Sequence, residues 1–159
     1  MAAHYAFLTT WVLTDTTIDA VYDAIYAYER WPEWWRGVVK VEQATAGDEL
    51  GVGAIARHSW RSVLPYTLHF EIESVRAERP FLLEGRASGE LAGTGRWRLY
   101  ERDSTVVVVY EWNVQTTRAW MNLVAPIARP IFRWNHNWVM NNGGTGLAQL
   151  LGAQLIAHA

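Results

Sequence analysis

Apolar and polar residues alternate over several short stretches of the chain, and this spacing predicts strands. Between positions 4 and 13, every second residue starting at Tyr5 is aromatic, β-branched or leucine. Because successive side chains of a strand point to opposite faces, these residues would line a core. Further stretches of strand character are 38–44, 53–63, 67–77, 81–88, 93–102 and 105–116. The sequence therefore predicts seven strands.

Two short helices are predicted between the first and second strands. Asp15 and Thr16 supply side chains suited to a helix N-cap, and apolar residues then recur at helical spacing to about position 28. Pro32 stands where a second helix begins, inside the Trp-Pro-Glu-Trp-Trp cluster at 31–35. We interpret this cluster as a hydrophobic plug that closes the sheet, in preference to a partly exposed gate touching ligand or a membrane surface.

The later strands are joined by short connections, which favour an antiparallel sheet because parallel strands need long crossovers. From Arg118 the spacing becomes helical, and Pro126 and Pro130 predict two helical segments or one kinked helix. Glycines at 143, 144 and 146 weaken the helical pattern, so residues 147–156 are expected to form a frayed or restarted helix. The stripe expected to face the core contains Trp120, Val124, Ile127, Ile131, Trp138 and Val139.

The composition supports a single α+β domain spanning residues 1–159, since the chain is 50% hydrophobic and has ten tryptophans. Its 14 basic and 16 acidic residues are scattered, which argues against nucleic acid as a partner. No apolar run approaches the length of an integral membrane segment. Without cysteines there is no need for an oxidising compartment, so we expect a cytoplasmic protein, either a monomer or a homodimer.

The order of predicted elements resembles that of the START-like superfamily, whose bacterial members are often called SRPBCC or polyketide cyclase/dehydrase proteins. The resemblance rests on the Trp31–Gly37 segment, Gly51-Val-Gly53, Gly89-Glu-Leu-Ala-Gly93, the strand pair ending in Thr105 and Trp112, and Ala125-Pro-Ile-Ala-Arg-Pro130 leading to Trp134-Asn-His136 and Met140. It implies a helix-grip fold, in which a curved seven-stranded antiparallel sheet wraps around a long C-terminal helix. It also implies a cavity for lipids, polyketides or other apolar ligands, but no single reaction.

Strand alternation predicts which side chains face that cavity. It turns Ala56, His58, Trp60, Leu68, Phe70 and Ile72 inward, together with Trp97, Leu99, Tyr110 and Trp112. Such an aromatic face suits a flat apolar ligand, although the same rings would also be able to fill the interior completely. The residues expected to contact ligand are Phe7, Trp11, Trp60, Phe70, Trp97, Trp112, Val124, Ile131, Asn135 and Val139.

Few residues offer acid–base chemistry. His58 and Tyr110 are the candidate catalytic residues, with Tyr66 as a further group that would polarise a carbonyl. Asn135 needs a buried partner, structural in preference to ligand, and His136 is interpreted as mainly structural. No metal site or cofactor is expected, because local ligand spacing is missing.

Three functions remain open at this point. Binding or transport of an apolar small molecule or lipid is favoured. A polyketide aromatase/cyclase or dehydratase, with His58 or Tyr110 moving a proton, is the alternative, and docking of a Trp-rich surface to a partner enzyme ranks last.

Overall fold

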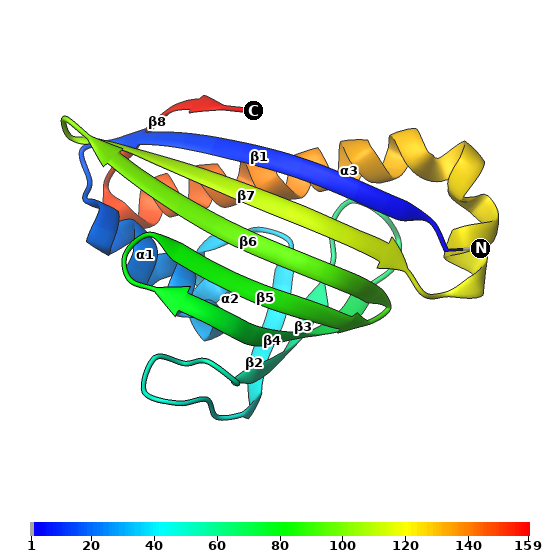
Figure 1. The fold of residues 1–159 in the computed structure, drawn as a ribbon. Helices are drawn as coiled ribbons and strands as arrows, with labels where there is room; N and C mark the ends of the chain where they lie inside the picture. Colours follow the sequence, from blue (N-terminus) through cyan, green and yellow to red (C-terminus); the bar gives the residue numbers. More distant parts are fainter. Residues whose placement is uncertain (1) are drawn as a thin grey trace.

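The strands of the chain join one curved antiparallel sheet that wraps a long helix, as the computed structural model of residues 2–159 shows (Figure 1). Eight strands are found in these residues, in the spatial order β2-β3-β4-β5-β6-β7-β1-β8. They are β1 (His4–Thr14), β2 (Val38–Thr45), β3 (Ile55–Trp60), β4 (Leu68–Glu78), β5 (Leu82–Gly89), β6 (Leu91–Arg102), β7 (Thr105–Thr116) and β8 (Gln154–His158). The α+β class and the antiparallel sheet around the terminal helix are confirmed.

Three short helical segments follow the first strand, and one long helix precedes the last strand. Between β1 and β2 come α1 (Ile18–Tyr26), the short 3-10 helix η1 (Tyr28–Arg30) and α2 (Trp31–Trp34). The long helix α3 (Ala119–Leu151) follows β7 and runs unbroken through both prolines. Figure 1 shows its first turns at an angle to the rest, which matches the kinked alternative. No helix within residues 2–159 combines the length and apolar character needed to cross a membrane.

The helix expected at 147–156 is present only as far as Leu151, where α3 ends, and the prediction is wrong beyond that residue, since Gln154–His158 form an eighth strand in addition to the seven expected. Gly152 adopts a left-handed conformation (φ 63°) that ends α3, as glycine does after many helices. The chain then reverses, and β8 pairs with the free edge of β1. Backbone hydrogen bonds between Thr10 and Ala159 extend this pairing and cover the edge.

The glycines at 143, 144 and 146 are close-packing positions and do not interrupt the helix, contrary to the expectation from sequence. A Cβ atom on Gly146 would lie 1.8 Å from the carbonyl oxygen of Trp34. One on Gly143 would lie 2.5 Å from the ring of Trp35. Glycine therefore lets α3 approach α2 at backbone distance, and the helix tolerates its weak propensity because packing compensates.

Two buried tryptophans fasten the same part of α3 to the rest of the fold. The indole of Trp11 in β1 donates to the carbonyl oxygen of Met140 at 3.1 Å. The indole of Trp35 donates to the carbonyl oxygen of Val139 at 2.8 Å. Each ring is 1% exposed, so these hydrogen bonds satisfy donors that would otherwise be unpaired in the core.

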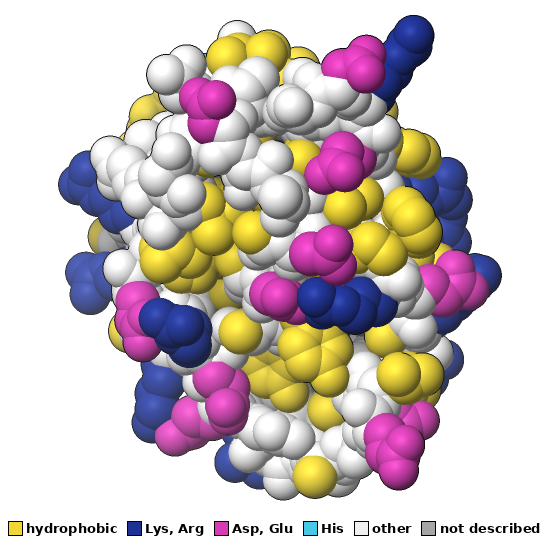
Figure 2. Space-filling view, turned by 90° about the vertical axis from the view of Figure 1, so that its left-hand side faces the viewer, with side chains coloured by type: hydrophobic (Ala, Val, Ile, Leu, Met, Phe, Trp, Pro, Cys, Tyr) yellow, Lys and Arg dark blue, Asp and Glu magenta, His cyan; other side chains and the backbone are white. Residues whose placement is uncertain are grey.

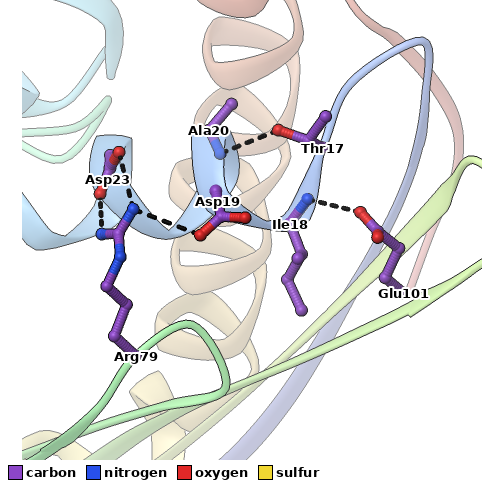
Figure 3. Close-up of polar contacts among 7 residues, drawn as sticks. All are labelled: Thr17, Ile18, Asp19, Ala20, Asp23, Arg79 and Glu101. Carbon is purple, nitrogen blue, oxygen red and sulfur yellow. Dashed lines mark hydrogen bonds and ion pairs between the residues drawn. The ribbon is translucent and has the colours of Figure 1, made fainter.

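Polar contacts hold α1 against the sheet (Figure 3). The cap of this helix is Thr17, whose hydroxyl accepts from the backbone N–H of Ala20 at 3.2 Å, and not Asp15 or Thr16 as the sequence suggested. Arg79, in the turn between β4 and β5, forms ion pairs with Asp19 and Asp23. These contacts hold the first turns of α1, whose last residues, Ile25 and Tyr26, belong to the wall of the cavity described next.

Candidate ligand-binding site

A cavity of about 640 Å³ lies between the inner face of the sheet, α1, α2 and α3. Alternation along β3 and β4 builds one wall, because every second side chain of these paired strands points inward. The lining residues from β3 and β4 include Ala56, His58, Trp60, Leu68, Phe70 and Ile72. The inward face predicted from the sequence is therefore the face that lines the cavity.

One end of the cavity is built from tryptophan rings. Trp35 contacts Trp31, Trp60 and Trp97 with centroid separations of 5.1, 5.0 and 6.1 Å. All four rings line the cavity, and Trp31 and Trp35 are buried. The 31–35 cluster thus closes the sheet from inside, as the plug interpretation expects, and Pro32, Glu33 and Arg36 are exposed.

His58 lies in the middle of the wall and is 4% exposed. Its ring stacks on Phe70 at 5.2 Å, and its Nδ1 atom accepts a hydrogen bond from the indole of Trp60 at 3.2 Å. This contact places the proton of the neutral ring on Nε2. Burial lowers the pKa of His58 to about 4, so the side chain is uncharged at neutral pH.

Tyr110 on β7 also lines the cavity and stacks on Trp97 with ring centroids 3.9 Å apart. Burial raises the pKa of its hydroxyl far above the usual value. The group stays protonated and is able to donate a hydrogen bond, but it is a poor source of phenolate. The side chains of His58 and Tyr110 thus share one cavity, and their catalytic roles stay a prediction.

Asn135 on α3 has the structural partner that its position requires. Its Oδ1 atom accepts a hydrogen bond from the hydroxyl of Ser62, in the segment between β3 and β4. Both residues line the cavity. The amide therefore fixes the β3–β4 connection against α3, while its other atoms border the ligand space.

His136 is the residue that sequence reasoning undervalued. It lines the cavity, and its ring stacks on Phe7 of β1 with centroids 3.8 Å apart. Burial lowers its pKa to about 4. The neighbouring Asn137 side chain raises the pKa against this effect, but it does not form a hydrogen bond with His136. Both ring nitrogens of His136 are thus buried without a hydrogen-bond partner. From sequence, His136 stands at the edge of the apolar stripe of the helical wheel, which gave no sign of this burial.

Seven of the ten residues expected to contact ligand line the cavity: Phe7, Trp60, Phe70, Trp97, Trp112, Asn135 and Val139. The structure places the other three elsewhere. Trp11 packs in the core behind the tryptophan end. Val124 and Ile131 are 37% and 49% exposed on the outer face of α3, in an outer stripe made of Trp120, Leu123, Val124, Ile127, Ile131 and Trp134.

The cavity reaches the surface beside α1. Tyr26 at the end of α1 and Leu50 in the β2–β3 loop belong to its wall and are 39% and 61% exposed. Figure 2 views the molecule from the side on which α1 lies and shows hydrophobic side chains in the middle of the face, among acidic and basic ones. The cavity is therefore open to solvent on this side of the molecule.

The acidic residues of the wall already have partners. Glu29 accepts from the backbone N–H of Gln43, Asp48 accepts from two backbone N–H groups of its own loop, and Glu84 pairs with Arg96 at 2.5 Å. Within residues 2–159, no three His, Asp or Glu side chains gather closely enough to hold a metal ion. The carboxylates of the wall are therefore held by groups of the protein itself.

Solved structures of similar shape were found. They include the di-domain ARO/CYC BexL from the BE-7585A biosynthetic pathway (TM-score 0.72, 17% identity, covering 95% of this chain and 51% of that one). The Zhui aromatase/cyclase from Streptomyces sp. R1128 matches with TM-score 0.69 and 14% identity over 96% of this chain and 94% of that one. A START superfamily protein from Mycobacterium smegmatis matches with TM-score 0.69 and 6% identity over 95% and 97%.

These likenesses show that the chain has the START-like helix-grip fold, and at such identities they show the fold alone. The chain spans about half the length of the di-domain protein. No protein family model matches the sequence. No curated protein matches it either. The likenesses do not say what occupies the cavity, so any ligand has to be argued from the cavity itself.

Proposed function

We propose that the chain binds, and transports or sequesters, an apolar small molecule of lipid or polyketide type in the cavity between the sheet and α3. The observation that carries this proposal is a cavity of about 640 Å³ with a mostly apolar wall that is rich in aromatic rings. Small-molecule sites commonly measure about 300–1,000 Å³ and are mostly apolar. Protein interiors are otherwise close-packed, so an open space of this size suggests a ligand.

The tryptophan end favours a ligand with a flat ring system. The indole N–H of Trp31 donates to the carbonyl of Ile25, that of Trp35 to the carbonyl of Val139, and that of Trp60 to His58. With these donors already paired, the three rings offer only apolar faces and edges. Contact with a ring or an extended apolar chain is the interaction that such surfaces stabilise.

A second candidate is an aromatase/cyclase or dehydratase acting on a poly-β-keto chain, favoured by the similar solved structures and by His58 and Tyr110 in one cavity. Proton abstraction is the difficulty. The unprotonated nitrogen of His58 is occupied by Trp60, burial lowers its pKa to about 4, and Tyr110 stays protonated. Both are able to polarise a carbonyl, but neither is a strong base near neutral pH, so binding ranks first.

Binding is tested with naphthalene, a purely apolar probe, by equilibrium dialysis, and with native mass spectrometry of gently purified protein. We expect uptake by the wild-type chain. In Leu68→Trp the added ring projects into the cavity, so naphthalene affinity should fall at least about tenfold. His69→Trp is the matched control, because this neighbour is exposed on the other face of β4 and should leave the affinity unchanged.

Absence of naphthalene uptake, together with no co-purified apolar molecule, would contradict the binding proposal. The second candidate is tested separately, with a short synthetic poly-β-ketone and detection of an aromatic product by absorbance. Product formed by the wild type, and lost in His58→Phe and Tyr110→Phe variants that still take up naphthalene, would place catalysis first.

A further inference from the structure

Three buried side-chain polar atoms in residues 2–159 lack any hydrogen-bond partner: the hydroxyl of Tyr5 and both ring nitrogens of His136. Such atoms are rare in folded proteins, because a buried donor or acceptor without a partner has lost its water without compensation. Both residues line the cavity, and Tyr5 is only 6% exposed. The wall therefore carries unused hydrogen-bonding capacity.

These atoms belong to the same end of the cavity. Tyr5 and Phe7 are successive inward positions of β1, while Phe132 and His136 are one turn apart on α3. The Tyr5 ring packs edge-on against Phe132 at 5.9 Å, and the Phe7 ring stacks on His136 at 3.8 Å. Two rows of side chains thus meet where β1 crosses α3.

This polar end is separate from the tryptophan end. Tyr5 belongs to a core cluster with Phe70 and Trp112, whereas Trp31, Trp35 and Trp97 belong to another. The partly buried side chains Trp60 and Tyr110 pack against both clusters, and the buried His58 contacts Phe70 of one and Trp31 of the other. A ligand that fills the cavity would meet apolar rings at one end and unpaired polar atoms at the other.

We propose that the end formed by Tyr5 and His136 receives a neutral oxygen of the ligand, a hydroxyl or a carbonyl, while the apolar body lies against the tryptophan rings. This inference rests on the proposed binding function and narrows its ligand class to apolar molecules with one oxygenated end. The Tyr5 hydroxyl donates to that oxygen, and the His136 ring either donates or accepts.

The charges nearby favour a neutral group over a carboxylate. Burial keeps His136 uncharged near neutral pH, so it offers no positive charge, and burial raises the pKa of Tyr5, so its hydroxyl stays a neutral donor. The guanidinium of Arg129 lies over the Tyr5 ring at 5.1 Å, but it donates to the carbonyl oxygen of His4 in an exposed position. A carboxylate buried at this end would have no paired cation, which proteins avoid.

The test compares naphthalene with 2-naphthol, which adds one hydroxyl to the same ring system. The measured quantity is the ratio of their dissociation constants in each variant, from equilibrium dialysis. We expect Tyr5→Phe to lower the preference for 2-naphthol about tenfold, as loss of a buried hydrogen bond does, with naphthalene binding changed less than about twofold. Tyr100→Phe, on a 52% exposed side chain, is the matched control and should change neither constant.

Two further measurements separate a ligand role from a structural one. Because the Tyr5 hydroxyl is unpaired in the free protein, Tyr5→Phe should leave the ligand-free melting temperature equal or higher, whereas a structural hydroxyl would lower it. His136→Phe keeps the stacking on Phe7 and should also reduce the preference for 2-naphthol, which supplies the test if Tyr5→Phe does not fold.

The measurements distinguish failure of the binding function from failure of the proposed oxygen recognition. If neither probe binds, the binding function itself is wrong. If naphthalene binds but the preference for 2-naphthol survives both substitutions, the polar end has no role in recognition and only this inference is overturned. If 2-naphthoate binds more tightly than 2-naphthol, the assignment to a neutral group is overturned.

Discussion

The two halves of α3 use apolar and small residues in opposite ways. In the first half, residues 119–134, the outer stripe leaves large apolar side chains in water, and Leu123 and Ile127 are 82% and 85% exposed. In the second half, residues 139–151, glycines and Leu147 are buried against α2 and β1. Side-chain hydrophobicity therefore does not decide which part of this helix is packed against the rest of the fold.

The deciding factor is how closely α2 and β1 approach each half of α3. The second half contacts the backbone of Trp34 and the rings of Trp11 and Trp35, so only a residue without a side chain fits there. The first half meets the cavity with its inner face and solvent with its outer face. Close packing stabilises one half, and the other borders the ligand space.

The largest expected effect on stability comes from adding a side chain where the second half of α3 packs closely against α2. Gly146→Ala places a Cβ atom 1.8 Å from the carbonyl oxygen of Trp34, which is backbone and unable to rotate away. We expect the free energy of unfolding to fall by at least about 3 kcal/mol, or the chain not to fold. The measurement is urea denaturation followed by far-UV circular dichroism. Thr145→Ala, at the exposed neighbouring position, should change it by less than about 0.5 kcal/mol.

A pH titration tests the junction between the halves, where His136 is buried. Its pKa is about 4 in the folded chain and near 6.5 when unfolded, so the unfolded chain binds more protons between these values. The contribution of His136 to the free energy of unfolding is therefore fully present above about pH 6.5 and is lost on acidification. Between pH 7 and about pH 4.5 this loss should amount to about 2 kcal/mol. In His136→Phe this part of the loss should disappear, as urea denaturation at both pH values would show. An unchanged acid dependence would mean that His136 is hydrated in the folded chain.

The sheet was predictable from the sequence to a large extent, because a strand has only two faces. Once Arg57 and Glu71 are assigned to water, the inward positions of their neighbours follow, and His58 was identified in this way. Asn135 was also identified, since an amide within an apolar pattern needs a partner. Ser62, which supplies it, comes from a loop that no periodicity describes.

Helix α3 was predictable as a helix but not in its orientation. Both of its faces carry apolar residues in the first half, so periodicity selected Trp120, Val124, Ile127 and Ile131 for the core, whereas Met121, Ala125 and Phe132 face inward. The glycines of the second half were interpreted as helix breakers for a similar reason. These glycines allow close packing against tryptophans that are distant in the sequence, and a single segment of sequence does not reveal such contacts.

The smallest expected effect belongs to the outer stripe and completes the comparison. Leu123→Ser and Ile127→Ser remove apolar side chains that are exposed in both the folded and the unfolded chain, so little transfer free energy changes. Each should alter the free energy of unfolding by less than about 0.5 kcal/mol. Met121→Ser, two residues before Leu123 and on the buried face, should cost about 2 kcal/mol or more. Urea denaturation of dilute protein measures all three, and a loss at Leu123 or Ile127 equal to that at Met121 would show that the stripe is covered in solution, so that the two halves are held alike.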